Sequence, residues 1–148
     1  MKLSQFGVLG SGAIAWISLT GAIAQAQETR AVMHQPILQV RGMLQNGDAT
    51  LGDNSLFDKY LLDCQAGQTL TITLESVDFD AYLMVYDAQG QRIAQNDDIS
   101  PVNRNAAVTV TVPADGIYRI VANAYNDLGN GQYKLSVITA AAASKPES

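Results

Sequence analysis

The stretch Thr69-Leu70-Thr71-Ile72-Thr73-Leu74-Glu75 decides the fold, because apolar and polar residues alternate strictly along it. Successive side chains of a β-strand point to opposite faces of the sheet, so Leu70, Ile72 and Leu74 would share one face. The threonines between them favour strands and would face the solvent. The stretch therefore predicts a half-buried antiparallel strand.

The same period of two recurs along the chain, for example in Val108-Thr109-Val110-Thr111-Val112. Turn residues such as Asp87-Ala88-Gln89-Gly90 separate these stretches, and no segment beyond the first 26 residues keeps a helical period. Many short strands between turns indicate a sandwich or a barrel. The expected strands are 37–43, 57–64, 68–76, 80–86, 91–95, 106–112, 117–124 and 132–139, and the expected core contains Leu70, Ile72, Leu74, Val108, Val110, Ile120 and Leu135.

The first 26 residues have the composition of a secretory signal peptide. No charged residue occurs between Lys2 and Glu28, and the apolar stretch ends in Ala24-Gln25-Ala26, whose small residues a signal peptidase reads. We therefore expect cleavage after Ala26, and an alternative cut lies after Ala24, because Ala22-Ile23-Ala24 has the same form. The product would be secreted or periplasmic, with no membrane segment left. The alternative is an uncleaved anchor, because the uncharged stretch is long enough to span a bilayer.

A chain of 148 residues suits one domain with its own core. The expected organisation is a signal peptide at 1–26, a mobile lead-in at 27–35, one β-sandwich domain at 36–139 and a disordered tail at 140–148. The formal net charge is −5, and no polybasic stretch is present. This charge excludes nucleic acid and an anionic membrane surface as natural partners, because both require clustered Lys and Arg.

The groups that common catalytic mechanisms need are scarce in this sequence. His34 is the single histidine and falls in the expected lead-in, and no Gly-x-Ser-x-Gly elbow occurs. Cys64 is the single cysteine, which excludes an intrachain disulfide, and it alternates in phase with Tyr60 and Leu62 as a small core residue would. We therefore expect a protein that is not an enzyme and has no catalytic or cofactor-binding residues.

A series of short motifs runs from residue 42 to residue 135. They are Gly42-x-Leu44, Asp58-x-Tyr60, Gly67-Gln68-Thr69-Leu70-Thr71-Ile72, Ser76-x-Asp78-Phe79-Asp80-x-Tyr82-Leu83, Asp87-x-x-Gly90, Asn96-Asp97-Asp98, Pro113-Ala114-x-Gly116-x-Tyr118 and Gly131-x-Tyr133-x-Leu135. In this order they resemble the bacterial pre-peptidase C-terminal (PPC) domain family, and the chain looks like a stand-alone member of the kind found in cyanobacteria. The resemblance implies an all-β fold, an antiparallel jelly-roll-like β-sandwich of about eight strands. Related collagen-binding domains bind calcium and a protein ligand.

Acidic residues cluster around one predicted hairpin. Asp78 and Asp80 precede the strand at 80–86, and Asn96-Asp97-Asp98 follows the strand at 91–95, so pairing of these strands would bring the two groups to one end of the sheet. Carboxylate and amide oxygens are the ligands that Ca²⁺ prefers. The sequence therefore predicts a calcium site formed by Asp78, Asp80, Asn96, Asp97 and Asp98. The alternative is ordinary turn chemistry, in which Asp and Asn bond their own backbone.

The loop after the strand at 117–124 carries Tyr125 and Asn126, which we expect to contact a ligand. The leading hypothesis is an exported, non-catalytic binding or accessory module that contacts a protein or a cell-surface polymer, stabilised by calcium. The alternatives are a carbohydrate-binding module and a chaperone-like partner of a separate secreted peptidase. A row of coplanar exposed aromatic rings would favour sugar, whereas a mixed patch of polar groups and tyrosine would favour protein.

Overall fold

The computed structural model describes residues 34–140, which form strands and turns. Within that range there is no helix with the length and hydrophobicity that crossing a membrane requires. The strands are β1 (His34–Leu44), β2 (Ala49–Thr50), β3 (Leu56–Cys64), β4 (Thr69–Glu75), β5 (Ala81–Tyr86), β6 (Arg92–Asn96), β7 (Ala106–Thr111), β8 (Gly116–Ala124) and β9 (Gly131–Ala140).

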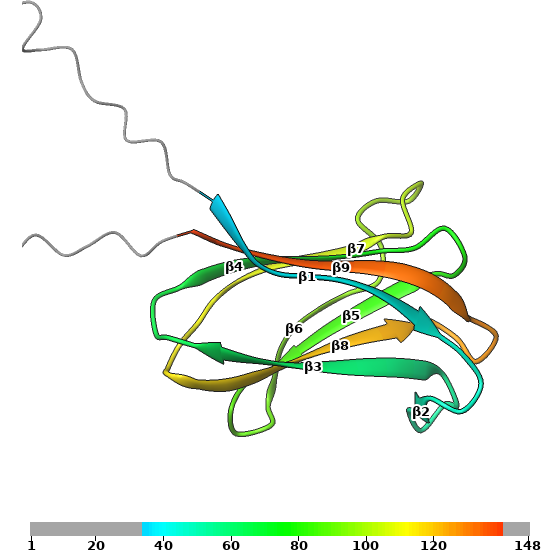
Figure 1. The fold of residues 1–148 in the computed structure, drawn as a ribbon, viewed down its shortest axis with the longest axis horizontal. Coiled ribbons are helices and arrows are strands. Elements are labelled where there is room, and N and C mark those ends of the chain that lie inside the picture. Colours follow the sequence, from blue (N-terminus) through cyan, green and yellow to red (C-terminus); the bar gives the residue numbers. More distant parts are fainter. Residues whose placement is uncertain (1–33, 141–148) are drawn as a thin grey trace, which may run out of the picture. The chain divides into compact units, whose positions relative to one another are not determined.

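The described strands form two sheets that face each other (Figure 1). One has the order β1-β9-β4-β7 and the other the order β2-β3-β8-β5-β6, and all the pairings are antiparallel. With the two-residue β2 set aside, this is the eight-stranded order of a jelly roll. The expected all-β sandwich is confirmed. Sequence reasoning missed β2, because two residues are too few to show a period.

The ordered strands extend slightly beyond the expected domain limits of 36 and 139. Strand β1 begins at His34, within the predicted lead-in, and β9 ends at Ala140, within the predicted tail. The reason is mutual pairing, since His34 lies opposite Ala140 in the ladder. The predicted signal peptide at 1–26, the rest of the lead-in and the tail from 141 onward lie outside the described residues.

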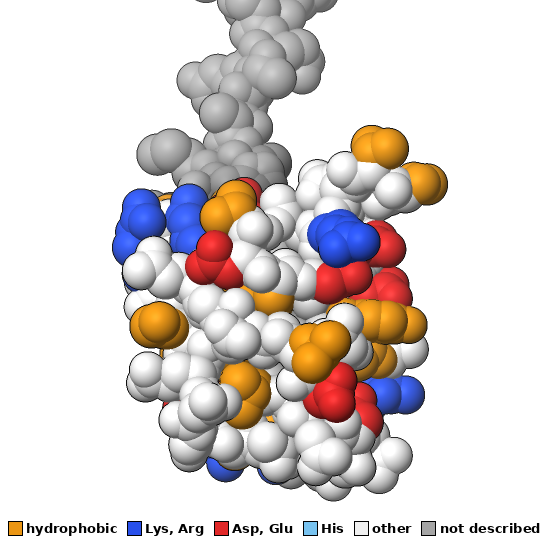
Figure 2. Space-filling view, turned by 90° about the vertical axis from the view of Figure 1, so that its right-hand side faces the viewer, with side chains coloured by type: hydrophobic (Ala, Val, Ile, Leu, Met, Phe, Trp, Pro, Cys, Tyr) orange, Lys and Arg blue, Asp and Glu red, His pale blue; other side chains and the backbone are white. Residues whose placement is uncertain are grey.

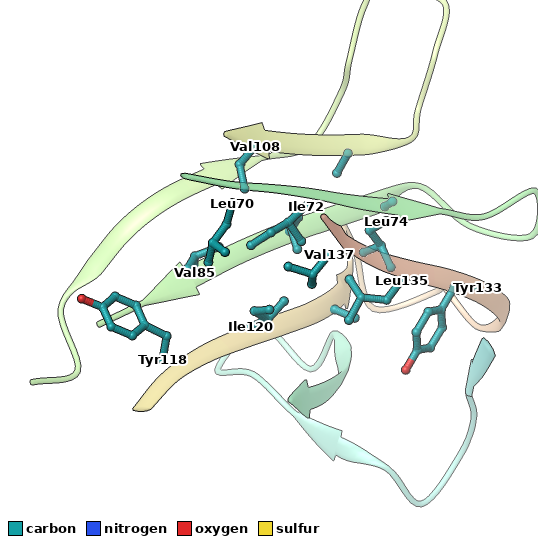
Figure 3. Close-up of a cluster of buried hydrophobic side chains, with 14 of the residues drawn as sticks. Leu70, Ile72, Leu74, Val85, Val108, Tyr118, Ile120, Tyr133, Leu135 and Val137 are labelled. Carbon is teal, nitrogen blue, oxygen red and sulfur yellow. The ribbon is translucent and has the colours of Figure 1, made fainter. Parts of the chain in front are cut away.

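The core lies between the two sheets (Figure 3). Leu70, Ile72 and Leu74 of β4 are buried and alternate with half-exposed threonines, as the opening stretch predicts. The other expected core residues are also buried, except Val110, which is half-buried against the cluster. Cys64 is buried too, and burial raises the pKa of its thiol, with the nearby Asp63 charge adding to the effect. A neutral buried thiol is a poor nucleophile.

Several motif residues form a polar bridge between the two sheets. The Tyr133 hydroxyl on β9 donates to Asp58 on β3 and is also bonded to the Tyr60 hydroxyl. Because Tyr133 has one proton to give, Tyr60 is the donor in their bond. Burial, followed by the bond to Asp58, raises the pKa of Tyr133 far above its usual value, so the hydroxyl stays neutral. Gly42 on β1 lies opposite Tyr133, and a Cβ at Gly42 would overlap the tyrosine ring.

A second motif closes the turn between β7 and β8. The Tyr118 hydroxyl donates to the Ala114 carbonyl at 2.8 Å, and the Tyr118 ring is buried. The motif residues Gly42, Asp58, Tyr118 and Tyr133 therefore hold the sandwich together. Their presence predicts the fold and does not by itself identify a ligand.

Candidate functional site

One end of the sandwich, which we call the loop end, carries the connections β1–β2, β2–β3, β4–β5, β6–β7 and β8–β9. The ladder places them together: the end of β4 pairs with the start of β7, and the start of β5 pairs with the end of β8. Of the nine large hydrophobic side chains that are exposed among the described residues, six lie here. Apolar exposure is therefore concentrated at this end. These six are Met43, Val77, Ile99, Val102, Tyr125 and Leu128.

Figure 2 shows this end of the molecule. Hydrophobic side chains are spread across it, acidic side chains gather towards its right side, and a group of Lys and Arg side chains lies at its upper left. The loop end thus combines apolar and charged groups. It is mixed in character rather than uniformly polar.

A hollow of about 510 Å³ lies at the loop end. Its walls come from β5 and β6 and from the β2–β3, β6–β7 and β8–β9 loops. We call it the tyrosine hollow, because two of its residues are tyrosines whose rings meet edge to face, with centroids 6.1 Å apart and planes at 74°. The residues that line it are Asp53, Tyr82, Gln95, Asn96, Asp97 and Tyr125.

Hydrogen bonds hold the walls of the tyrosine hollow in place. The Tyr82 hydroxyl donates to Gln95 Oε1 at 2.7 Å, which ties neighbouring strands together. Asp53 Oδ1 accepts from the amide and the hydroxyl of Ser55, and these bonds, the hydroxyl first, lower the pKa of Asp53. Asp97 Oδ1 accepts from the Asp98 amide at 3.0 Å. In both carboxylates Oδ1 makes these local bonds, and Oδ2 has no hydrogen bond to the described part of the chain.

Asn123 on β8 holds the end of the β2–β3 loop, which contributes Asp53 to the hollow. Its buried amide donates to Ser55 Oγ at 3.0 Å and to the Leu56 carbonyl at 2.7 Å. These bonds anchor the β2–β3 loop to β8. The position of Asp53 is therefore set by a buried contact and not by the loop alone.

The predicted ligand-contact residues Tyr125 and Asn126 behave differently. The Tyr125 side chain is 52% exposed and lines the tyrosine hollow, while its amide donates to the Asp80 carbonyl. Asn126 is not among the residues that line the hollow, and its Oδ1 accepts from the Leu128 amide at 3.1 Å. Asn126 therefore shapes the β8–β9 loop.

Part of the predicted calcium set does come together around Asp80. Burial raises the pKa of Asp80, and the charges of Asp98 and Asp97 raise it further, while Arg104 opposes them. Arg104 Nε lies 4.0 Å from Asp80 Oδ2, and Asp80 Oδ1 is buried with no hydrogen-bond partner. The folded protein therefore holds the proton of the Asp80 carboxyl group more tightly than the unfolded chain does. As the pH rises above 3.8, the pKa of Asp80 in the unfolded chain, this carboxyl group lowers the stability of the fold.

Asp78 and Asn96, the other two residues of that set, each accept a hydrogen bond from a backbone amide through one side-chain oxygen. Asp78 Oδ2 accepts from the Gln132 amide at 2.7 Å, and Asn96 Oδ1 accepts from the Ala107 amide at 3.1 Å. Residues 77–79 form a bend, so the extended backbone that would have put Asp78 and Asp80 on one side is absent from these residues. Within residues 34–140 no group of three or more His, Cys, Asp and Glu side chains is placed to hold a metal ion.

Sequence reasoning missed Asp53, Tyr82 and Gln95 as members of the hollow. The sequence could have indicated Tyr82, because it lies between Ala81 and Leu83, which are buried, and so its side chain points away from the core. Gln95 is its partner across the β5–β6 hairpin. Asp53 had no signal, since it comes from a loop that reaches the hollow only through the tertiary fold.

A larger hollow of about 670 Å³ lies over β1, β4 and β9 at the same end. Arg41, Met43 and Lys134 are among its lining residues, and Lys134 Nζ lies 3.8 Å from Glu75 Oε2. Its charged groups therefore neutralise one another in part. It widens the exposed surface of the loop end.

Comparison with known proteins agrees with the architecture. The profile of the family described as the bacterial pre-peptidase C-terminal domain matches residues 57–124, which is just under half of the chain. No curated protein matches the sequence.

Among solved structures, the fold is similar to that of Aeromonas hydrophila PliG, a periplasmic lysozyme inhibitor of g-type lysozyme. The identity is 18%, the TM-score is 0.50, and the match covers 77% of this chain and 92% of that one. The pre-peptidase C-terminal domain of collagenase from Bacillus anthracis is also 18% identical, with a TM-score of 0.49 and coverage of 68% and 87%. The segment 57–124 is thus similar to a PPC domain, and it lies within a complete jelly-roll sandwich.

Proposed function

We propose that this protein is an exported, non-catalytic module that binds a protein partner through its loop end. The observation that carries the proposal is the concentration of exposed hydrophobic side chains at the loop end, one of which, Tyr125, lines the tyrosine hollow. Loops held by a rigid sandwich are common positions for binding residues, and clustered apolar exposure is typical of protein contacts. The fold is compatible with this role, since a periplasmic lysozyme inhibitor shares it, but a fold alone selects no partner.

The geometry of the tyrosines favours protein over sugar. Tyr82 and Tyr125 meet at 74°, so the two rings do not form one flat platform on which a sugar ring could stack. Tyrosine with exposed apolar and polar neighbours is instead the composition expected of a protein contact. A carbohydrate-binding module remains the alternative, and a binding assay with cell-wall glycans would separate the two.

The experiment that tests the proposal is affinity capture from the producer's secreted and envelope fractions. The bait would be the wild-type protein, compared with the double variant Tyr125→Ala with Leu128→Ala. We expect the wild type to capture one or more proteins, and we expect the double variant to capture at least tenfold less of them. The matched control is Leu61→Ala with Ile117→Ala, which removes exposed apolar groups outside the loop end and should capture normally. Equal capture by all three baits would contradict the proposal.

Export is part of the proposal and has its own test. The uncharged stretch before Glu28 and the Ala24-Gln25-Ala26 ending support signal-peptide cleavage. We expect intact-mass analysis of the exported protein to show a chain that begins at Gln27. Recovery of the full-length chain in the membrane fraction would mean that the segment is an anchor.

We also propose that calcium binds near Asp80, whose pKa is raised first by burial and then by the charges of Asp98 and Asp97. Binding would require the carboxylates of Asp80, Asp97 and Asp98 to move closer together, because as placed they do not form a group that can hold a metal ion. A cation that binds only the folded state would stabilise it by about 1.4 kcal/mol at a tenfold excess over its Kd. We expect millimolar calcium to raise the melting temperature of the wild type but not that of Asp80→Asn with Asp97→Asn. Identical melting with calcium and with chelator would leave the acidic residues as turn chemistry.

A further inference from the structure

The chemistry of the tyrosine hollow narrows the kind of group that can enter it. Two carboxylates, Asp53 and Asp97, and two aromatic rings line it, and no Lys or Arg is among the described residues that do so. Ser55 lowers the pKa of Asp53, so that carboxylate is charged at neutral pH. Arg104 lies 4.0 Å from Asp80, and neither residue lines the hollow.

Carboxylates and tyrosine faces attract the same class of ligand. A cation gains from the negative face of an aromatic ring and from charge-assisted hydrogen bonds to carboxylate oxygens. An anion would be repelled by both aspartates, and a purely apolar group would leave their remaining oxygens without partners as it displaced water. The amide side chains of Gln95 and Asn96 already accept hydrogen bonds through their oxygens from Tyr82 and Ala107, so the carboxylates are the principal acceptors that remain.

We infer that the tyrosine hollow binds a Lys or Arg side chain of a protein partner, and that the partner is basic where it meets the loop end. The inference rests on the proposed function and deepens it, because it names the charge of the partner. The overall charge agrees, since the chain carries 9 basic and 14 acidic residues. Long-range attraction would then steer a basic partner towards this end and would weaken as salt is added.

The occupant is a side chain presented by a protein, because the hollow lies within the exposed apolar surface of the loop end. Tyr125 belongs both to the hollow and to the exposed hydrophobic residues around it. A basic side chain entering the hollow would therefore bring the rest of the partner towards the exposed apolar residues of the loop end, such as Leu128 in the same loop as Tyr125. A free amine would use the hollow and leave that apolar surface uncovered.

The test is a nuclear magnetic resonance titration of the exported chain with tetralysine amide. The matched probe is the same peptide with all four side-chain amines acetylated. We expect saturable shifts that cluster at the amides of Tyr82, Gln95, Asn96 and Tyr125 with tetralysine and no such shifts with the acetylated peptide. Raising the salt from about 50 to 300 mM should weaken binding severalfold.

Variants that remove equal charge distinguish binding at the tyrosine hollow from attraction to the overall negative charge of the chain. Asp53→Asn with Asp97→Asn should weaken tetralysine binding by about tenfold or more, and Tyr125→Ala should weaken it by about two- to fivefold. Asp63→Asn with Asp115→Asn removes the same charge at the opposite end and should bind as the wild type does. Equal loss in the two double variants, or equal binding of the acetylated peptide, would overturn the inference.

The outcomes distinguish this inference from the proposed function. If the captured partner is unaffected by Asp53→Asn with Asp97→Asn but is lost in the Tyr125→Ala and Leu128→Ala double variant, the binding function stands and the cationic occupant is wrong. If tetralysine binds at the hollow while no partner is captured through the loop end, the cation site stands and the proposed function is wrong.

Discussion

Replacing Ile72 by alanine is expected to lower the free energy of unfolding by about 2–5 kcal/mol. Ile72 is fully buried on β4, between its ladder partners Val108 on β7 and Val137 on β9. Truncation removes apolar area from the core and leaves a cavity that rigid strands cannot close. Chemical denaturation followed by tryptophan-independent probes, such as far-ultraviolet circular dichroism, would measure the change.

The matched control for Ile72 is its neighbour Thr71. That side chain lies on the opposite face of β4, where its hydroxyl is 3.3 Å from the Thr109 hydroxyl. Thr71→Ala should cost less than about 1 kcal/mol, because it removes one cross-strand pair and no core volume. Similar losses in the two variants would mean that the two faces of β4 do not differ as the structure shows.

Replacing Tyr133 by alanine is expected to destabilise the fold by about 3–5 kcal/mol. The variant loses a buried ring and leaves Asp58 and Tyr60 without their shared partner. Part of the cost therefore comes from half-buried polar groups that cannot all recover water. Equilibrium denaturation of the variant would measure it, and Tyr133→Phe should recover the packing while the hydrogen-bond loss remains.

Gly42 provides an independent check on the same contact. A Cβ at Gly42 would overlap the Tyr133 ring, so Gly42→Ala should cost about 1–3 kcal/mol through overpacking. Gly52→Ala is the matched control, since nothing lies within 4 Å of a Cβ there. In the double variant with Tyr133→Ala the cost of Gly42→Ala should vanish, because the ring that it meets is gone. Additive costs would show that the two residues are not in contact.

Much of the sandwich could be predicted from the sequence because strand formation is encoded locally. The alternation at 69–75 predicts which side chains face inward, and Leu70, Ile72 and Leu74 are buried as it predicts. All eight longer strands were expected within two residues at their ends, apart from the start of β1. That start was missed because residue 34 depends on pairing with Ala140, more than one hundred positions away.

The candidate site was less accessible from the sequence because its parts are distant along the chain. Asp97 and Tyr125 were singled out, but for different reasons, as a calcium ligand and as a ligand contact. That they line one hollow depends on the antiparallel register, which brings the end of β6 and the end of β8 to the two sides of β5. Asp78 was assigned to the acidic cluster, but its carboxylate instead bonds the start of β9.

The sequence by itself determined that residues 34–140 form strands, which residues fill much of the core, and that the chain carries a net negative charge. These properties depend on hydrophobic period, composition and charge, which can be read from the sequence without knowing which residues meet in the fold. Only the tertiary structure decided that Asp53, Tyr82, Asp97 and Tyr125 surround one hollow, and that Gly42 makes room for Tyr133. These contacts form where strands that are distant in the sequence pair and where the two sheets pack together, so no local sequence pattern predicts them.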